Sequence, residues 1–415
     1  MGSTETKNHP QEALFRNRGL GVNQWYFFPS KGLRMFRLNL FTMANPIWIM
    51  TSAFDQLSLE ETIDKALQIG VQGLDLCVFR KDGTRNDFVA THLDYQNFGP
   101  VEAQMLLKKF NQAQLRLSLG AFENLIGGDP AQRLHNQNHL LRLIRIAYLL
   151  GGDENDITVG TFVGYNHELG NQEGGFEKNL LEYQRIFGPI IRYAASLGVT
   201  VVYENCPMEG WRSSGFTGTF NNLSGVLAAR KLMYELVPEK NHGEIYDPSH
   251  DVWQHTSPLE VLRHTDIARI RRIHVKSTRN VSDPYWGNMY PVQAIRPEWA
   301  DKVGITSSKN PWDRHHYEAT LPGFGLGDSM DWRAFVEFIR AKGYTGPFEI
   351  ENEALLSKQT GKMGAIVQGC KAAVQNLAPL LWELTEDGWV YPEAAHQPLK
   401  DVGRKDVPLM TIDRL

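Results

Sequence analysis

Short apolar runs alternate with longer amphipathic segments from about residue 46 to about residue 385. The first pair is PIWIMTSAF (46–54) followed by SLEETIDKALQIG (58–70). In the second segment Ser58 and Glu61 have capping-box spacing, and Gly70 is a helix stop signal. Short apolar runs are typical of buried strands, and amphipathic segments are typical of helices that cover them. The alternation therefore predicts repeated units of a strand followed by a helix.

Seven further runs complete the series of strand candidates, and each is followed by a segment with helical character. In chain order they are QGLDLCVF, RLSLGAF, DITVGTFVG, VTVVYEN, GEIYDPSH, RRIHVKS and GPFEIENE. Eight strand-then-helix units are the number needed for a closed (β/α)8 TIM barrel with right-handed crossovers. An open doubly wound sheet is the main rival, but no glycine-rich phosphate fingerprint follows the first strand. We therefore predict an α/β fold of the TIM-barrel class.

Three segments do not follow this alternation. Residues 1–44 are polar and then aromatic without a clear period, and we interpret them as an N-terminal arm. Residues 278–330 form an insertion after the seventh strand, and loops of that length in a compact domain are usually lids or binding loops. Residues 388–415 are polar and rich in proline, and we interpret them as a surface tail. The predicted barrel accordingly covers residues 45–387, with the insertion inside it.

Composition and charge narrow the class of function. The 415 residues carry a formal net charge of −4, with no block of Lys or Arg of the kind that binds nucleic acid. No apolar run is long enough to cross a bilayer. Three widely separated cysteines, Cys77, Cys206 and Cys370, argue against a disulfide framework. The opening residues also lack a secretory signal, so we expect a cytoplasmic protein that acts on a small molecule.

Each of the last four predicted strands ends at a residue that can bind a metal ion. These residues are Glu204, Asp247, His274 and a glutamate of FEIENE. The strand ends of a parallel barrel converge on one mouth, so these side chains should meet there. Carboxylates with one imidazole suit Mn²⁺, Mg²⁺, Co²⁺ or Zn²⁺.

The last strand offers three glutamates, and the pattern alone does not choose the metal ligand among them. Glu349, Glu351 and Glu353 alternate along the strand and so share one face. Position along the strand favours Glu351, because it should lie at about the same depth in the barrel as Glu204, Asp247 and His274. A strand-end carboxylate is also a common helix N-cap, and this alternative applies to each candidate taken alone.

Further polar residues should face the same mouth. Pro248 forces a turn that presents His250, although an Asp-Pro-Ser turn with an exposed histidine is also common. Lys276 shares a face with His274, so it could hold a substrate oxygen, act as an acid or base with a depressed pKa, or form only a salt bridge. We add Arg279 and His315 of the insertion as candidates for substrate binding.

Five pieces in this order resemble the xylose-isomerase-like TIM-barrel superfamily, in particular its sugar isomerase/epimerase group with ketose 3-epimerases and inosose dehydratases. They are ENCP (204–207), DPSH (247–250), IHVKS (273–277), PGFG (322–325) with Asp331 and Trp332, and GYTGPFEIENE (343–353). The resemblance implies that a divalent ion, commonly Mn²⁺, is held by Glu204, Asp247, His274 and Glu351. It also implies that Glu204 and Glu351 transfer protons and that His250 contacts a substrate oxygen.

The chain departs from this pattern beside the candidate site. Many relatives carry an acid after the HVK or HAK motif, whereas this chain has Ser277, Thr278 and Arg279. The insertion is also longer than in minimal epimerases, and the N-terminal arm is extra. These differences bear on the substrate more than on the metal.

The residues and the resemblance together predict a divalent-metal-dependent sugar isomerase or epimerase that transfers protons through a metal-stabilised enediolate. A metal-dependent carbon–oxygen lyase, either a dehydratase or an enzyme that cleaves 3-keto-glycosides, is the main alternative. An AP-endonuclease-like phosphodiesterase is a third, disfavoured because the chain is acidic and lacks the surplus of histidines such a site needs. A metal-free binding protein is the non-enzymatic alternative. The expected partner is a carbohydrate, and a homo-oligomer remains open.

Overall fold

The structure is a computed structural model that describes residues 44–83, 90–208, 221–280, 296–304, 317–325, 330–354, 357 and 362–412. The chain divides into two units, Met1–Thr42 and Met43–Leu415, and every described residue belongs to the second. The predicted N-terminal arm therefore lies outside the described residues except at its last position. Parts of the predicted insertion, including His315, also lie outside them.

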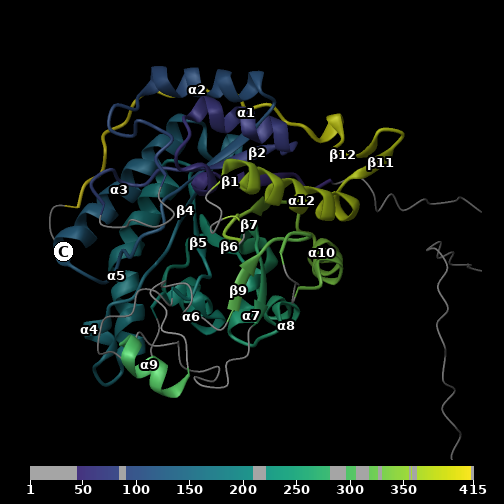
Figure 1. Cartoon of the computed structure of the whole chain (residues 1–415). Coiled ribbons are helices and arrows are strands. Elements are labelled where there is room, and N and C mark those ends of the chain that lie inside the picture. The colour runs from purple at the N-terminus through teal and green to yellow at the C-terminus, as the bar shows by residue number, and fades with distance from the viewer. Residues whose placement is uncertain are drawn as a thin grey trace, which may run out of the picture. The chain divides into compact units, whose positions relative to one another are not determined.

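Eight parallel strands close into a barrel, so the predicted TIM-barrel fold is confirmed (Figure 1). Going round the barrel, the order is β1, β10, β7, β6, β5, β4, β3 and β2, which excludes the open doubly wound sheet. The strands are β1 (Ile47–Met50), β2 (Gly73–Cys77), β3 (Arg116–Gly120), β4 (Thr158–Thr161), β5 (Thr200–Glu204), β6 (His242–Tyr246), β7 (Ile270–Val275) and β10 (Phe348–Ile350).

Helices connect the strands and surround the barrel (Figure 1). The longer ones are α1 (Leu59–Ile69), α2 (Pro100–Gln112), α3 (Pro130–Leu149), α5 (Gly175–Ser196), α6 (Leu227–Leu236), α10 (Trp332–Ala341) and α12 (Met363–Leu381). The shorter ones include α4 (His167–Gly170), α7 (Pro248–Trp253), α8 (Pro258–Arg263) and α9 (Pro297–Val303). Among the described residues, no helix combines the length and apolar character needed to cross a membrane.

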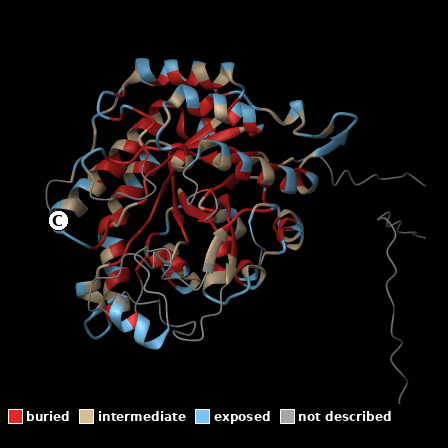
Figure 2. Cartoon of the chain, viewed as in Figure 1, coloured by how far each residue is buried: buried red, intermediate tan, exposed pale blue. Residues whose placement is uncertain are grey.

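Local sequence explains where the first helix begins and ends. The Ser58 side chain accepts a hydrogen bond from the Glu61 backbone N–H at 3.2 Å, and the Glu61 carboxylate accepts one from the Ser58 N–H at 2.9 Å. Gly70 ends the helix with φ at +90°, a conformation that favours glycine. Ile63, Ala66 and other residues of α1 are buried, and the helices around the barrel carry buried and exposed residues in alternation along their length (Figure 2). The predicted caps are confirmed.

Two small antiparallel sheets and a C-terminal strap add to the barrel. β8 (Ser277–Asn280) pairs with β9 (Tyr317–Thr320), so the predicted insertion begins as one strand of a two-stranded sheet. β11 (Glu383–Thr385) pairs with β12 (Gly388–Val390). Beyond them the tail runs over α2 and α3, where Asn111 and Asn138 hydrogen-bond the backbone of Leu399 and Ile412.

Candidate metal centre

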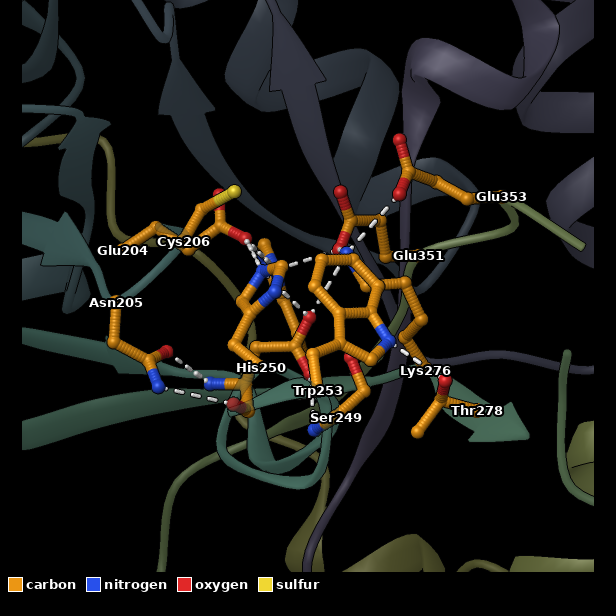
Figure 3. Close-up of polar contacts among 12 residues, drawn as sticks. Glu204, Asn205, Cys206, Ser249, His250, Trp253, Lys276, Thr278, Glu351 and Glu353 are labelled. Carbon is orange, nitrogen blue, oxygen red and sulfur yellow. Dashed lines mark hydrogen bonds and ion pairs between the residues drawn. The ribbon is translucent and has the colours of Figure 1, made fainter. Parts of the chain in front are cut away.

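The four predicted metal ligands meet at the carboxyl ends of their strands. Glu204 is the last residue of β5, Asp247 follows β6, His274 lies near the end of β7, and Glu351 follows β10. Each offers one donor atom, all four donors lie within 4.8 Å of one another, and all four residues are buried. Residues spread over about 150 positions of sequence thus form one cluster at the mouth, with Glu204 and Glu351 on its two sides (Figure 3).

Glu204 is held through both its backbone and its side chain. Its carbonyl oxygen accepts a hydrogen bond from the Ser224 hydroxyl at 2.6 Å, in the turn that precedes α6. Its Oε1 lies 3.0 Å from Nε2 of His250 and 3.4 Å from Nδ1 of His274. These contacts fix the carboxylate toward the centre of the cluster.

Asp247 is both the N-cap of a helix and a candidate metal ligand. Its Oδ1 accepts a hydrogen bond from the Ser249 N–H at 2.8 Å and so caps α7. Asn205 donates to its carbonyl oxygen at 3.0 Å and accepts from its N–H at 2.7 Å (Figure 3). Its Oδ2 faces the cluster, 3.2 Å from Nε2 of His250. One oxygen therefore fixes the local backbone, while the other faces the cluster, where it contacts His250 and Lys276.

His274 lies in the middle of the group, with its two ring nitrogens facing different carboxylates. Nδ1 is 3.1 Å from Oε2 of Glu351 and points to the cluster. Nε2 is 3.3 Å from Oε1 of Glu349, on the inner side of the barrel. Burial lowers the pKa of His274, but the charges of Glu351 and Glu204 outweigh it and hold this pKa well above its usual value.

The three glutamates of FEIENE, of which Glu349 lies within β10 and the other two follow it, have different surroundings. β10 pairs with β7 so that Glu349 is opposite His274. Glu349 contacts His274 from below, Glu351 belongs to the ligand cluster, and Glu353 accepts a hydrogen bond from Lys276 at 3.1 Å. Depth along the strand separates them, as the sequence argument for Glu351 assumed.

Lys276 is a buried cation among these carboxylates. Its Nζ lies 2.7 Å from Oε2 of Glu351, 2.9 Å from Oδ2 of Asp247, and 5.3 Å from the ring centre of Trp253. Burial lowers its pKa, but the neighbouring carboxylates, Asp247 foremost, raise it well above the usual lysine value. These contacts favour an ammonium ion in a salt-bridge network over a lysine with a depressed pKa (Figure 3).

Both candidate proton-transferring glutamates are ionised in this setting. Burial and the charge of Glu351 raise the pKa of Glu204, but His274 and His250 bring it down to about 2. Burial raises the pKa of Glu351 as well, and Lys276 and His274 hold it well below its usual value. At neutral pH both side chains are carboxylates, which is the form that binds a metal ion or accepts a proton.

The donor set fits a divalent ion. Three carboxylates and one imidazole form a hard, oxygen-rich set that suits Mn²⁺ or Mg²⁺ and also accommodates Co²⁺ or Zn²⁺. His274 presents one nitrogen to the cluster and the other to a carboxylate, which is the usual arrangement of a metal-binding histidine. A second grouping of Glu204, Cys206 and His250 shares Glu204 with the first and offers fewer carboxylates.

The other predicted site residues have different positions. His250 is fully buried and contacts two of the ligand carboxylates. Arg279 lies on β8 and pairs with Glu318 of β9, outside the four-residue cluster. His315 lies outside the described residues.

Sequence reasoning did not find Asn205 or Trp253. The Trp253 indole N–H donates to the Thr278 hydroxyl at 2.6 Å, and its ring meets that of His250 edge-on, with centroids 4.4 Å apart. Trp253 follows His250 by three residues, so one turn of a helix after the DPSH motif was the available signal. Asn205 directly follows Glu204, but only the fold shows that it reaches the next strand.

The chain belongs to the xylose isomerase-like TIM barrel family, whose model matches residues 63–364. Among curated proteins, no sequence matches the chain. Solved structures that resemble it include a xylose isomerase domain protein from Planctomyces limnophilus, with 15% identity, a TM-score of 0.52, and coverage of 81% of this chain and 97% of that one.

An L-ribulose 3-epimerase is also similar, with 15% identity, a TM-score of 0.51, and coverage of 81% of this chain and 94% of that one. A D-psicose 3-epimerase with D-tagatose from Clostridium cellulolyticum H10 has 12% identity, a TM-score of 0.50, and coverage of 81% and 99%. At these identities the likeness to solved structures shows the fold alone.

Proposed function

We propose that the protein is a divalent-metal-dependent isomerase or epimerase of a sugar or keto-sugar, with Mn²⁺ as its metal. The observation that carries this proposal is the buried cluster of Glu204, Asp247, His274 and Glu351, whose donor atoms lie within 4.8 Å of one another. The cluster occupies the carboxyl ends of the barrel strands, where TIM-barrel enzymes have their active sites. Two structures of the same fold are described as ketose 3-epimerases, which supports the same class of substrate.

The geometry suits transfer of a proton between two faces of a sugar carbon. A divalent ion, when bound, would polarise a substrate carbonyl and so acidify the neighbouring C–H bond. Glu204 ends β5 and Glu351 directly follows β10, and β6 and β7 separate these two strands around the barrel. Their carboxylates therefore approach the centre from different sides (Figure 3). One carboxylate would remove the proton as a general base, and the other, after taking up a proton from solvent, would return it to the opposite face as a general acid.

Other residues of the site would bind and orient the substrate. The Lys276 ammonium lies beside Glu351 and can donate hydrogen bonds to a sugar oxygen. Trp253 places an aromatic ring beside Lys276, and such rings provide an apolar face for a sugar. His250 holds Glu204 and Asp247 and lies close enough to the cluster to reach a substrate oxygen.

Incubation with keto-sugars and keto-glycosides in deuterated water, with Mn²⁺ or with a chelator, tests the proposal. We expect Mn²⁺-dependent incorporation of one solvent deuterium at a single carbon, with the carbon skeleton unchanged. Release of water or of an aglycone would instead identify the carbon–oxygen lyase. Protein that binds none of Mn²⁺, Mg²⁺, Co²⁺ and Zn²⁺ would contradict both.

A further inference from the structure

Beneath the ligand cluster, the barrel interior contains a layer of charged side chains. Arg272 of β7 lies with its Nη1 2.6 Å from Oδ1 of Asp75 on β2 and 3.0 Å from Oε2 of Glu349 on β10. All three side chains are almost fully buried. We call Asp75, Arg272 and Glu349 the interior relay.

Glycines on the neighbouring strands leave room for this layer. A Cβ atom at Gly160 of β4 would lie 2.5 Å from Nη2 of Arg272, and one at Gly120 of β3 would lie 2.9 Å from Oδ2 of Asp75. Both distances are shorter than a van der Waals contact allows, so a larger residue at either position would displace the relay. The barrel wall is therefore shaped around these charges.

The relay ends at the metal centre. The two oxygens of Glu349 have separate partners: Oε2 faces Arg272 at 3.0 Å, and Oε1 faces Nε2 of His274 at 3.3 Å. Arg272 and Asp75 thus fix the carboxylate, and the carboxylate fixes one edge of the imidazole. The opposite edge of the ring, at Nδ1, then points to Glu204 and Glu351.

Barrel stability alone does not account for such a layer. The interior of a TIM barrel is usually filled by branched apolar side chains. Taking charges out of water is costly, and apolar replacements of a buried ion pair are often neutral or stabilising. The cost is visible at Asp75, since burial raises its pKa to about 7 although Arg272 opposes the change. A role in positioning explains why charges occupy this layer.

We propose that the interior relay positions His274 for metal binding. The Glu349 carboxylate, 3.3 Å from Nε2, would keep the ring proton on Nε2 and so direct the Nδ1 lone pair at the ion. The relay thereby sets metal affinity without contacting the metal. This inference rests on the proposed function, because it assumes that the four-residue cluster holds a divalent ion.

Mn²⁺ titration of purified variants by calorimetry tests the relay without any substrate. Glu349→Leu removes the acceptor, and Glu349→Gln keeps the shape of the side chain but removes its charge. Glu244→Gln is the matched control, because Glu244 is equally buried and pairs at 3.0 Å with Arg230, outside the ligand cluster. Chemical denaturation of each metal-free variant measures its folding stability separately.

We expect Glu349→Leu to weaken Mn²⁺ binding about 10- to 100-fold, the usual effect of removing a partner of a metal-binding histidine, and Glu349→Gln to weaken it less. Glu244→Gln should lower stability but leave Mn²⁺ affinity within about twofold of wild type. If the Glu349→Leu variant does not fold, the test compares the Mn²⁺ affinity of the Glu349→Gln variant with that of the Glu244→Gln variant.

The position of the imidazole proton gives an independent measurement. In ¹⁵N-histidine spectra of the Zn²⁺-loaded protein, His274 should carry its proton on Nε2. A proton on Nδ1, or Glu349 variants that fold and bind Mn²⁺ as tightly as wild type, would overturn the relay while the proposed function stands. Wild-type protein that binds no divalent ion would overturn both.

Discussion

The two halves of the barrel have the same backbone plan and different chemistry. Strands β1 to β4 and strands β5, β6, β7 and β10 are almost entirely buried and follow one another in a single closed sheet. Every member of the four-residue ligand cluster comes from the second half. In the first half, β1 is wholly apolar, and β3 and β4 contribute a hydroxyl pair, Ser118 and Thr158, whose oxygens are 3.1 Å apart.

This difference separates folding from function. The first half forms a tightly packed part of the barrel wall. Its Asp75 is also a member of the interior relay. The second half supplies the side chains that converge on the mouth. Substitutions of wall residues in the first half, Asp75 excepted, should therefore change the free energy of unfolding, and substitutions of the ligand cluster in the second half should change metal binding and turnover.

The largest effect is expected for the two proposed proton-transferring residues of the second half. Glu204→Gln and Glu351→Gln remove the carboxylate that would exchange a proton with the substrate carbon. General acid–base groups contribute about 10²- to 10⁴-fold, so each variant should lose at least ~100-fold in kcat at saturating Mn²⁺. Deuterium exchange and product formation measure this loss. Near-normal turnover in either variant would remove that residue from proton transfer.

A smaller effect is expected for substitution of Lys276, and this substitution should strengthen Mn²⁺ binding. Its ammonium contacts Oδ2 of Asp247 and Oε2 of Glu351, two carboxylates of the ligand cluster. Lys276→Met removes a fixed cation that opposes a second cation nearby, so Mn²⁺ should bind about tenfold more tightly, or ~1.4 kcal/mol. The metal-free protein should become less stable, because two buried carboxylates, Asp247 and Glu351, lose their partner.

Lys276→Arg is the control for charge, and its Mn²⁺ affinity should stay closer to wild type. Calorimetric titration compares the three proteins under identical buffer and salt. Weaker metal binding in Lys276→Met would show that the ammonium chiefly holds Asp247 and Glu351 in position.

Metal binding in the second half should also depend on pH. Neighbouring carboxylates hold the pKa of His274 well above its usual value in the metal-free protein, so Nδ1 must lose a proton before it binds a metal. Mn²⁺ affinity should therefore rise with pH, by about tenfold per unit where one proton is released, until the pH exceeds this pKa. Calorimetry in buffers of different ionisation enthalpy counts the protons. Binding that does not change between pH 6 and pH 8 would exclude His274 as a ligand that must deprotonate.

The sequence was sufficient to predict the barrel and the residues that meet at its mouth. Apolar runs of strand length revealed all eight strands, and convergence of strand ends grouped Glu204, Asp247 and His274 with a glutamate of FEIENE, for which depth and the family resemblance selected Glu351. The meeting of these side chains was predictable because the carboxyl ends of parallel strands lie at one edge of the sheet, independently of the loop sequences.

The interior relay was not predictable in the same way. Asp75 lies within the run QGLDLC, and nothing local shows that its side chain faces Arg272 across the barrel. Pairing between strands far apart in sequence depends on barrel closure and register, which hydrophobic pattern does not report. The same reason explains why Glu349 was recognised as a candidate but not as the partner of His274.

The smallest effect is expected for the hydroxyl pair of the first half. The Ser118 hydroxyl lies 3.1 Å from that of Thr158 and accepts a hydrogen bond from the Thr158 N–H at 3.2 Å. Ser118→Ala removes these buried interactions, so the free energy of unfolding should fall by about 1 kcal/mol. Mn²⁺ affinity should stay within about twofold of wild type, since β3 and β4 contribute no member of the ligand cluster. A tenfold loss of affinity in this variant would show that the first half acts on the metal centre by a route other than Asp75, because a change confined to the wall would then reach the ligands.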